Sequence, residues 1–464
     1  MNSKNIKKAG LFYTFGSFFS KGIAFFTVPI FTRILSTTDY GMVSTYNSWV
    51  GIVTVLLSMT LYMAIRQSFI DYPDRVDEIH STITIFITAI SFATVILCII
   101  GGAAIGYSVL IPIFCIIQGY AAALIENYSM QLMMQYRYIL RTCLMVLPNL
   151  VSIILAVMLI LQGKVYPLYL GRIIPTAIVI FIFGIAVLGV VLKRCVKFDF
   201  ELLKYSLAIS VPLIAHGLAL TILSQSDRTM ITAIVGADKT GIYSVVYNFS
   251  MIAMALTTAL GGIWQPWYLA KLKNGAKEDL NRVNEMTKAY TLFMTAIMCG
   301  VIMMAPEVLR LLASEQYWEG VSIIPPIVLA NLITFIYTFY VDIEHFHKKT
   351  KSIAGNTIFA AVCNIILNLI FIRLCGYEAA AYTTIASYAV SLMVHYIYAK
   401  KLEPRITSLK SYWPMFMVVI VVSIIYYTAI DYWYIRWIVA FGVAIYVLVY
   451  LYRKYGIFFN NHKQ

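Results

Sequence analysis

Fourteen long apolar segments constrain this chain more than any other feature, because a segment of about 20 apolar residues is what crosses the hydrocarbon core of a membrane. The segments fill most of the 464 residues, of which 61% are hydrophobic and 12% charged. We therefore predict an all-α integral membrane protein with about fourteen transmembrane helices and no soluble domain. The expected spans are 10–35, 40–65, 80–103, 107–135, 139–162, 165–192, 205–226, 240–268, 287–305, 321–341, 353–374, 377–399, 411–430 and 433–452.

The basic residues are sorted between alternate connections. If the N-terminus is cytoplasmic, 26 of the 35 Lys and Arg residues fall in cytoplasmic segments and seven fall in outer ones. This is the bias that the positive-inside rule describes, and it places both termini in the cytoplasm. It also accounts for the net charge of +14 without a nucleic-acid partner, since a nucleic-acid-binding protein would carry a basic face on a soluble domain. The longest connection, residues 269–286, is too short for a folded catalytic module.

Two basic connections, 193–204 and 400–410, divide the chain into a six-span lobe at 1–200, a second at 201–405 and an accessory helix pair at 406–464. A short pattern recurs in both lobes. Gly41-Met42-Val43-Ser44 precedes Tyr46-Asn47, and Gly241-Ile242-Tyr243-Ser244 precedes Tyr247-Asn248. Both copies open the second span of a six-span block. Six spans per lobe give the lobes the same orientation, as in transporters built from parallel repeats.

Polar residues recur at helical spacing inside several spans, and two basic residues, Lys21 and Arg172, lie within spans rather than at their ends. Buried charge in a bilayer marks an ion pair, a wet cavity or an anionic ligand. A Lys21–Glu126 ion pair and a cationic lumen both fit, and Ser, Thr and Gly alone would fit simple helix packing. The predicted anion-binding residues are Lys21, Arg172, Arg228 and Arg66, and the predicted polar lumen residues are Asn47, Ser58, Asn248 and Glu126.

Ionisable residues that could couple transport to an ion form a second predicted group: Asp227, His216, His395 and Glu126. For both histidines a hydrogen-bonded packing role is the alternative. A run of possible metal ligands at Asp342, Glu344, His345 and His347 lies beside three lysines, and we interpret it as a solvated helix end. The acidic run Asp71, Asp74, Asp77 and Glu78 is interpreted as a solvated loop. We expect no metal and no cofactor.

Several short segments of the sequence resemble a known family. The relevant segments are Pro29–Leu35 with Asp39-Tyr40-Gly41, then Ser226-Asp227-Arg228, Gly241–Ser244 and Trp264-Gln265-Pro266-Trp267. Together with the six-six-two layout they resemble the multidrug/oligosaccharidyl-lipid/polysaccharide (MOP) exporter superfamily, in its polysaccharide branch of O-antigen and capsule repeat-unit flippases. The resemblance implies a bacterial plasma-membrane protein that moves undecaprenyl-pyrophosphate-linked oligosaccharides to the outer leaflet by alternating access. It also implies coupling to an ion gradient, of H⁺ or Na⁺, or to the membrane potential and, as partners, a glycan polymerase and a chain-length regulator.

Two other functions remain open from the sequence. A cation-coupled multidrug antiporter of the same superfamily would display acidic residues in its lumen, whereas the in-span charges here are mainly basic. A membrane glycan polymerase or ligase would resemble its own class in having a large outer loop with catalytic Arg and His, and no such loop is present. We therefore expect a transporter and not an enzyme.

Overall fold

The computed structural model describes residue 23 and residues 25–106, 108–163, 165–274 and 276–456. Within these ranges the chain forms α-helices and short 3-10 helices and contains no strand. Eleven of the described helices are long and apolar enough to cross a membrane. The prediction of an all-α multi-pass membrane protein is confirmed, while the number of fourteen spans stays a prediction.

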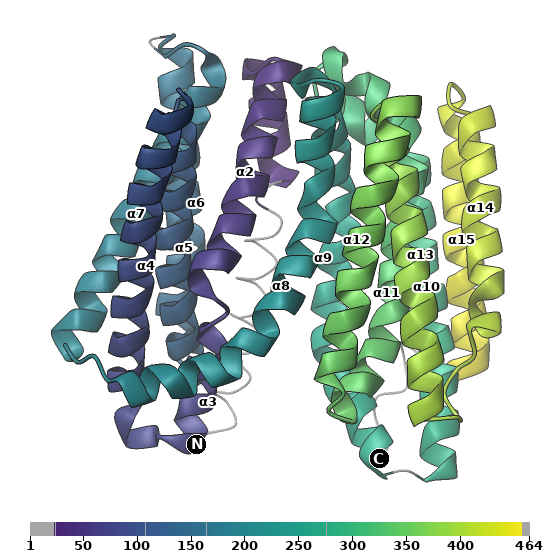
Figure 1. The fold of residues 1–464 in the computed structure, drawn as a ribbon. Helices are drawn as coiled ribbons and strands as arrows, with labels where there is room; N and C mark the ends of the chain where they lie inside the picture. The colour runs from purple at the N-terminus through teal and green to yellow at the C-terminus, as the bar shows by residue number, and fades with distance from the viewer. Residues whose placement is uncertain (1–22, 24, 107, 164, 275, 457–464) are drawn as a thin grey trace. The chain divides into compact units, whose positions relative to one another are not determined.

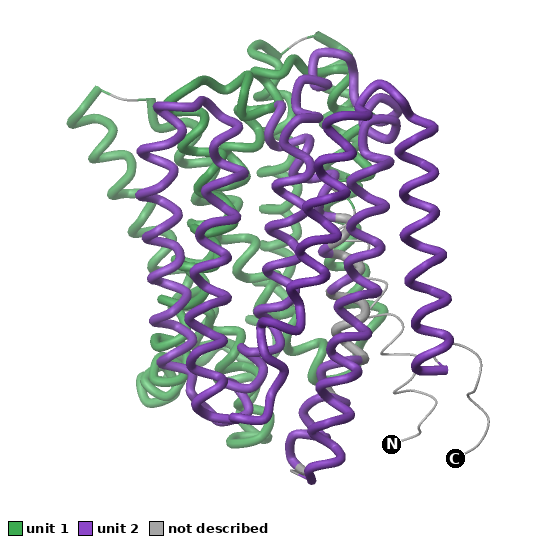
Figure 2. The backbone as a smooth tube through the Cα atoms, turned by 90° about the vertical axis from the view of Figure 1, so that its right-hand side faces the viewer, with its two compact units in different colours: residues 1–241 green, residues 242–464 purple. Residues whose placement is uncertain are grey.

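The chain forms two compact units, residues 1–241 and 242–464 (Figure 2). The predicted lobe boundaries at 200 and 405 remain predictions. After a short apolar helix at Phe25–Ile34, the helices of the first unit are α2 (Thr37–Ser58), α3 (Tyr62–Asp71), α4 (Val76–Ile105), α5 (Leu110–Met134), α6 (Tyr138–Leu161), α7 (Leu168–Arg194) and α8 (Phe200–Ile234). Then follow α9 (Ala237–Asn274), α10 (Lys277–Leu312), α11 (Ile324–Phe346), α12 (Thr350–Cys375), α13 (Ala379–Leu402), α14 (Trp413–Thr428) and α15 (Trp433–Tyr455), with 3-10 helices at Pro73–Arg75, Glu315–Ile323 and Leu409–Tyr412 (Figure 1).

In the first unit α5 is the central helix, packing against α2, α3, α4, α6 and α7. Glycines let its neighbours approach closely: a Cβ on Gly184 of α7 would lie 2.6 Å from the Cβ of Ala121, and one on Gly119 would lie 2.9 Å from Val53. Small residues at helix crossings are the usual means of close packing in membranes, where lipid removes the hydrophobic drive for association. The unit's apolar core lies where α3, α4, α5 and α8 meet.

Helix α8 belongs to the first unit through its contacts with α2, α3 and α4. Figure 1 shows its first part lying across the ends of the neighbouring helices before the helix bends and rises beside α2. Pro212 lies inside α8, and a proline bends a helix because it lacks an amide donor and its ring displaces the preceding turn.

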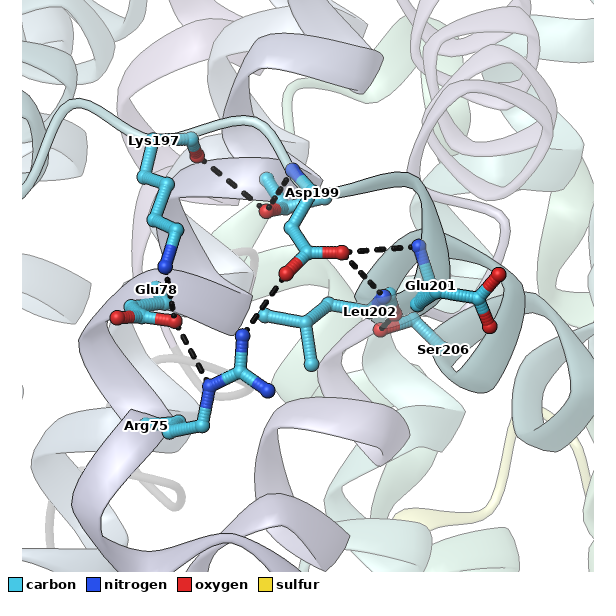
Figure 3. A network of polar contacts seen from close by, with 8 residues as sticks. Arg75, Glu78, Lys197, Asp199, Glu201, Leu202 and Ser206 are labelled. Carbon is cyan, nitrogen blue, oxygen red and sulfur yellow. Dashed lines mark hydrogen bonds and ion pairs between the residues drawn. The ribbon is translucent and has the colours of Figure 1, made fainter.

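A polar network fixes the connection between α7 and α8 to the first turn of α4 (Figure 3). Arg75 bridges Glu78 and Asp199, each at 2.8 Å, and Lys197 lies 3.0 Å from Glu78. Asp199 also caps α8 by accepting from the amide of Glu201 at 2.9 Å. The interpretation of the acidic run as a solvated loop is therefore wrong for Glu78, because Glu78 lies in the first turn of α4 and its carboxylate pairs with Arg75 and Lys197.

Acidification is expected to release this connection. The pKa of the Asp199 carboxyl is lowered because the amide of Leu202, the guanidinium of Arg75 and the amide of Glu201 all donate to its charged form. A lowered pKa means that the stabilisation is present above the ordinary Asp value of about 3.9 and is lost as the pH falls through the folded-state value. A spin label introduced by Val196→Cys should therefore become mobile below about pH 4 in electron paramagnetic resonance.

The matched controls for this prediction are two further substitutions. Asp199→Ala should make the label mobile at every pH, because neither Arg75 nor the helix amides then have their acceptor. Asp74→Ala removes an exposed carboxylate from the same segment and should leave the label as in the parent protein. A label that stays immobile in Asp199→Ala would show that Asp199 is not needed to hold the connection.

The two copies of the sequence repeat touch each other at their glycines. A Cβ on Gly41 of α2 would lie 1.7 Å from the carbonyl oxygen of Ala237, and a Cβ on Gly241 would lie 2.0 Å from the carbonyl oxygen of Thr37. The contact is reciprocal, since each glycine faces the first residue of the helix that carries the other. Only a residue without a side chain allows backbones to meet this closely.

In the second unit α10 is long and central, and it packs against α11, α14 and α15. The segment predicted as the connection 269–286 is mostly helical: α9 continues to Asn274 and α10 begins at Lys277, with Lys271 and Asp279 paired at 2.7 Å. Lys and Glu are good helix formers, so the helices extend past their apolar stretches.

The accessory helices α14 and α15 dock on α10 through a buried arginine. Arg436 of α15, only 1% exposed, forms an ion pair with Glu307 of α10 and donates to the carbonyl oxygens of Met303 at 3.2 Å and Ala429 at 3.1 Å. Ala429 directly follows α14, so the guanidinium joins all three helices. From the sequence, Arg436 is one of the seven basic residues expected on the outer side, where it would be solvated; docking against α10 buries it instead.

Candidate functional site

A polar cavity of about 460 Å³ lies within the first unit. Its walls come from α2, α3, α5, α6 and α7. Its polar lining residues are Thr54, Tyr62, Glu126, Ser129, Arg141 and Asn149. The cavity thus combines one guanidinium, one carboxylate, three hydroxyls and one amide against an apolar background of Ala, Leu, Ile, Met and Pro. Such a set binds a polar molecule by hydrogen bonds and an anionic group by charge.

The short turn between α5 and α6 positions Arg141. Tyr136 adopts a left-handed backbone with φ of 57°, and the amide of Arg137 donates to the carbonyl of Leu132 at 2.9 Å, which closes the turn. Arg141 therefore falls in the first turn of α6, beside the last turns of α5. Its Nε donates to the Oγ of Ser129 at 3.1 Å, which holds the guanidinium against the cavity wall.

Glu126 is the predicted residue that the structure places in this cavity. Its side chain is exposed, and among the described residues none forms a hydrogen bond or ion pair with its carboxylate. The alternative of a Lys21–Glu126 ion pair stays a prediction, because Lys21 lies outside the described residues. A carboxylate without a partner among the described residues remains available to a ligand.

Three of the predicted anion-binding residues, Arg172, Arg66 and Arg228, do not line this cavity. Arg172, in the first turn of α7, places its guanidinium carbon 4.0 Å from the centre of the Phe31 ring, a cation–π contact. Its Nη1 is buried and has no hydrogen-bond partner within the described part of the chain. Arg66 is exposed on α3. Arg228, 6% exposed, donates to the carbonyl of Ser224 at 3.1 Å and to Gln225 at 2.8 Å.

The remaining predicted lumen and coupling residues are spread over several helices. Asn47 is exposed on α2, Ser58 and Asp227 are 1% exposed, and His216 and Asn248 are half-buried on α8 and α9. The structure therefore does not gather them into one site within either unit, and their roles stay predictions.

Two buried carboxylates at the end of α11 correct one interpretation. Glu344 is fully buried and its Oε1 lies 2.7 Å from Nδ1 of His395 on α13, while Asp342 is 9% exposed and accepts from Gln265 at 2.6 Å. These two side chains are not at a solvated helix end, because α9 and α13 cover them. In the part of the chain that the structure describes, no three His, Cys, Asp or Glu side chains form a metal site.

The sequence matches the family model described as polysaccharide biosynthesis protein over residues 6–272, more than half of the chain. The chain belongs to this family. No curated protein sequence matches it. Every residue that lines the Glu126 cavity lies inside the matched range.

Solved structures show the fold of this family member. A structure described as the lipid II flippase MurJ in an inward closed conformation has a TM-score of 0.68 at 17% identity, covering 96% of this chain and 99% of that one. An inward-facing multidrug resistance MATE transporter of the MOP superfamily has a TM-score of 0.65 at 12% identity, covering 83% and 95%. A MOP superfamily transporter from Pyrococcus furiosus has a TM-score of 0.56 at 12% identity, covering 86% and 96%. The expected MOP fold is confirmed.

Sequence reasoning missed Arg141 as a cavity residue, because its charge was counted with the cytoplasmic connections. One signal was present: Arg141 falls inside the predicted span 139–162, so its charge could not belong wholly to the connection. In the structure Arg141 and Glu126 are the two charged residues that line this cavity.

Proposed function

We propose that this protein is a flippase that moves undecaprenyl-pyrophosphate-linked oligosaccharide repeat units from the cytoplasmic to the outer leaflet for surface polysaccharide synthesis. The match to the polysaccharide biosynthesis family over residues 6–272 carries the proposal. The structural likeness to a protein described as a lipid II flippase supports it, since that likeness covers 96% of the chain. Whether the product is O-antigen or capsule depends on the sugars that the cell supplies.

The cavity offers the groups that a sugar pyrophosphate needs. The Arg141 guanidinium would bind phosphate oxygens through charge-assisted hydrogen bonds, which are stronger than neutral ones. The hydroxyls of Tyr62 and Ser129 and the amide of Asn149 would bind sugar hydroxyls, and Glu126 would accept hydrogen bonds from them. The isoprenoid tail has no need of a polar site, because it remains in the bilayer.

The lobes at 1–200 and 201–405 would expose the substrate alternately to the two sides of a bacterial plasma membrane, with both termini in the cytoplasm. An ion gradient, of H⁺ or Na⁺, would drive the cycle, because the described part of the chain has no nucleotide-binding domain. A glycan polymerase and a chain-length regulator would take the product on the outer face. The helices at 406–464 would be accessory to the two lobes.

Replacing Arg141 is expected to cut transport. In proteoliposomes that contain a fluorescent undecaprenyl-pyrophosphate oligosaccharide, Arg141→Gln should lower the initial rate by roughly tenfold or more at subsaturating substrate, because a hydrogen bond to a charged group contributes about 1.5–3 kcal/mol. The rate is read from the protection of the label against a membrane-impermeant reductant. The matched control is Arg137→Gln, an exposed arginine one turn earlier in the same segment.

Equal rates for Arg141→Gln and the parent protein would remove the cavity from the transport path. No transport of the glycolipid by the parent protein would overturn the proposed function.

A multidrug antiporter is the second candidate, favoured by the carboxylate of Glu126 in the cavity and by the likeness to multidrug transporters of the MOP superfamily. A cationic dye is the discriminating substrate. Extrusion of the dye by the parent protein and its loss in Glu126→Gln, with no movement of the glycolipid, would establish this alternative.

A further inference from the structure

Glu344 and His395 form a buried acid–base couple in the second unit. The carboxylate comes from α11 and the imidazole from α13, two helices that pack along each other. Glu344 Oε1 lies 2.7 Å from His395 Nδ1, and the two side chains are 0% and 1% exposed. The ring of Tyr337, which precedes Glu344 on α11, stacks on the imidazole of His395 with ring centroids 5.7 Å apart. The stacking fixes the ring plane, so that Nδ1 points at the carboxylate.

In the described part of the chain the couple has no Lys or Arg partner. Among the described residues neither Glu344 nor His395 forms an ion pair with a Lys or Arg side chain, and Glu344 Oε2 is buried without a hydrogen-bond partner. His345, exposed on α11, interacts electrostatically with both members. Further titratable groups on the surrounding elements include Asp342 and Tyr340 on α11, Tyr268 on α9, Tyr290 on α10, Lys351 on α12, Tyr396 and Lys400 on α13, and Tyr412 before α14.

Several of these groups have hydrogen-bond partners of their own or are exposed to solvent. Asp342 accepts from Gln265, Lys400 donates to the carbonyl of Ile406 at 3.0 Å, and Lys351 is exposed. Apart from the interaction with His345, the charge of the couple is therefore decided between its own two members. With one proton it is neutral overall, whether that proton sits on the imidazole or on the carboxylate. Without it, a buried carboxylate is unpaired, and a second proton leaves a buried imidazolium unpaired; both are costly in a medium of low dielectric constant.

We propose that the Glu344–His395 couple is the proton-binding site that links transport by this protein to a proton gradient. This rests on the proposed function. The couple takes up one proton when it is open to the side of higher proton concentration, and it releases the same proton when it opens to the other side. Glu344 Oε2 is the receiving atom, because it is the member oxygen without a partner. Na⁺ fits this site poorly, since hard cations take oxygen ligands and one of the two groups is an imidazole.

Transport in proteoliposomes tests the proposal. An imposed pH gradient should accelerate flipping of the fluorescent glycolipid by the parent protein. Glu344→Gln keeps the side-chain shape and a hydrogen bond to His395 but cannot ionise, so it should retain flipping without a gradient and lose the acceleration. His395→Gln should behave in the same way.

Glu403→Gln is the matched control. Its carboxylate lies at the end of α13 and contacts His347 of α11 at 3.9 Å, but it is partly exposed, so the response to the gradient should be kept. Acceleration by the gradient in Glu344→Gln and His395→Gln equal to that in the parent protein would overturn the proposal. A response of the parent protein to a Na⁺ gradient alone would overturn it as well.

A second measurement needs neither substrate nor flipping, and so separates this proposal from the proposed function. Hydrogen exchange of α11 and α13 in the purified protein, corrected for the intrinsic rate, should differ between about pH 5 and about pH 8. The change should be absent in Glu344→Gln and present in Glu403→Gln. Identical pH profiles in all three proteins would overturn the assignment, even if the glycolipid is transported.

Discussion

Gly41→Ala is expected to lower the stability of the protein by about 3 kcal/mol, the upper part of the range for overpacking a closely packed site. The added methyl group would lie 1.7 Å from the carbonyl oxygen of Ala237 and 2.9 Å from the amide nitrogen of Gly241. Both neighbours are backbone atoms, which cannot rotate away as a side chain would. Relief requires the start of α2 to move from the start of α9. The midpoint of thermal denaturation in detergent, followed by loss of the monodisperse peak in size-exclusion chromatography, measures the effect.

Gly101→Ala is the control for the helix propensity of alanine. Gly101 lies inside α4 with no atom within 4 Å of the added Cβ, so the substitution should be neutral or stabilise by up to about 1 kcal/mol. Gly241→Ala should behave like Gly41→Ala, since its Cβ would lie 2.0 Å from the carbonyl oxygen of Thr37. Equal midpoints for Gly41→Ala and Gly101→Ala would show that the two helix starts are not in contact.

Arg436→Leu is expected to destabilise the second unit by about 3–5 kcal/mol, the cost of removing one partner of a buried ion pair. Leucine fills much of the space but leaves Glu307 without its cation and the carbonyl of Ala429 without its donor. The loss should be local at first, because Arg436 joins α14 and α15 to α10. Limited proteolysis in the connection at 403–412 should therefore accelerate before the whole protein denatures.

Arg453→Leu provides the comparison. Arg453 is exposed in the last turn of the same helix, and its replacement should leave both the denaturation midpoint and the proteolysis rate unchanged. A proteolysis pattern for Arg436→Leu like that of the parent protein would mean that the apolar faces of α14 and α15 suffice for docking on α10.

The helices could be predicted from the sequence because their lengths follow from the thickness of a bilayer. The expected spans 107–135 and 353–374 correspond to helices at Leu110–Met134 and Thr350–Cys375. The prediction was wrong where a helix leaves the membrane without ending. Residues 269–286 are rich in charged residues, which suit water and also suit a helix, so hydropathy alone could not separate a loop from a continued helix.

The candidate site was harder to predict, because charge burial depends on tertiary packing. Arg436 and Glu307 are far apart in sequence and meet only because α15 docks on α10. Glu344 and His395 likewise meet across α11 and α13. Glu126 could be identified as a deeply placed carboxylate, but its companion Arg141 was assigned to a connection. The charge of a residue and its position along a span can be predicted from the sequence. The residue that it pairs with depends on how the helices pack.

The reciprocal contact of Gly41 and Gly241 has a consequence for the origin of the chain. Each glycine lies against the first residue of the other's helix, Thr37 or Ala237. Contacts between equivalent residues are how two identical subunits meet on a two-fold axis, in an isologous interface. A dimer of half-length chains joined end to end would preserve this contact within one polypeptide. A larger residue at one glycine cannot then be compensated by a smaller residue at the other, because neither glycine has a side chain to shorten.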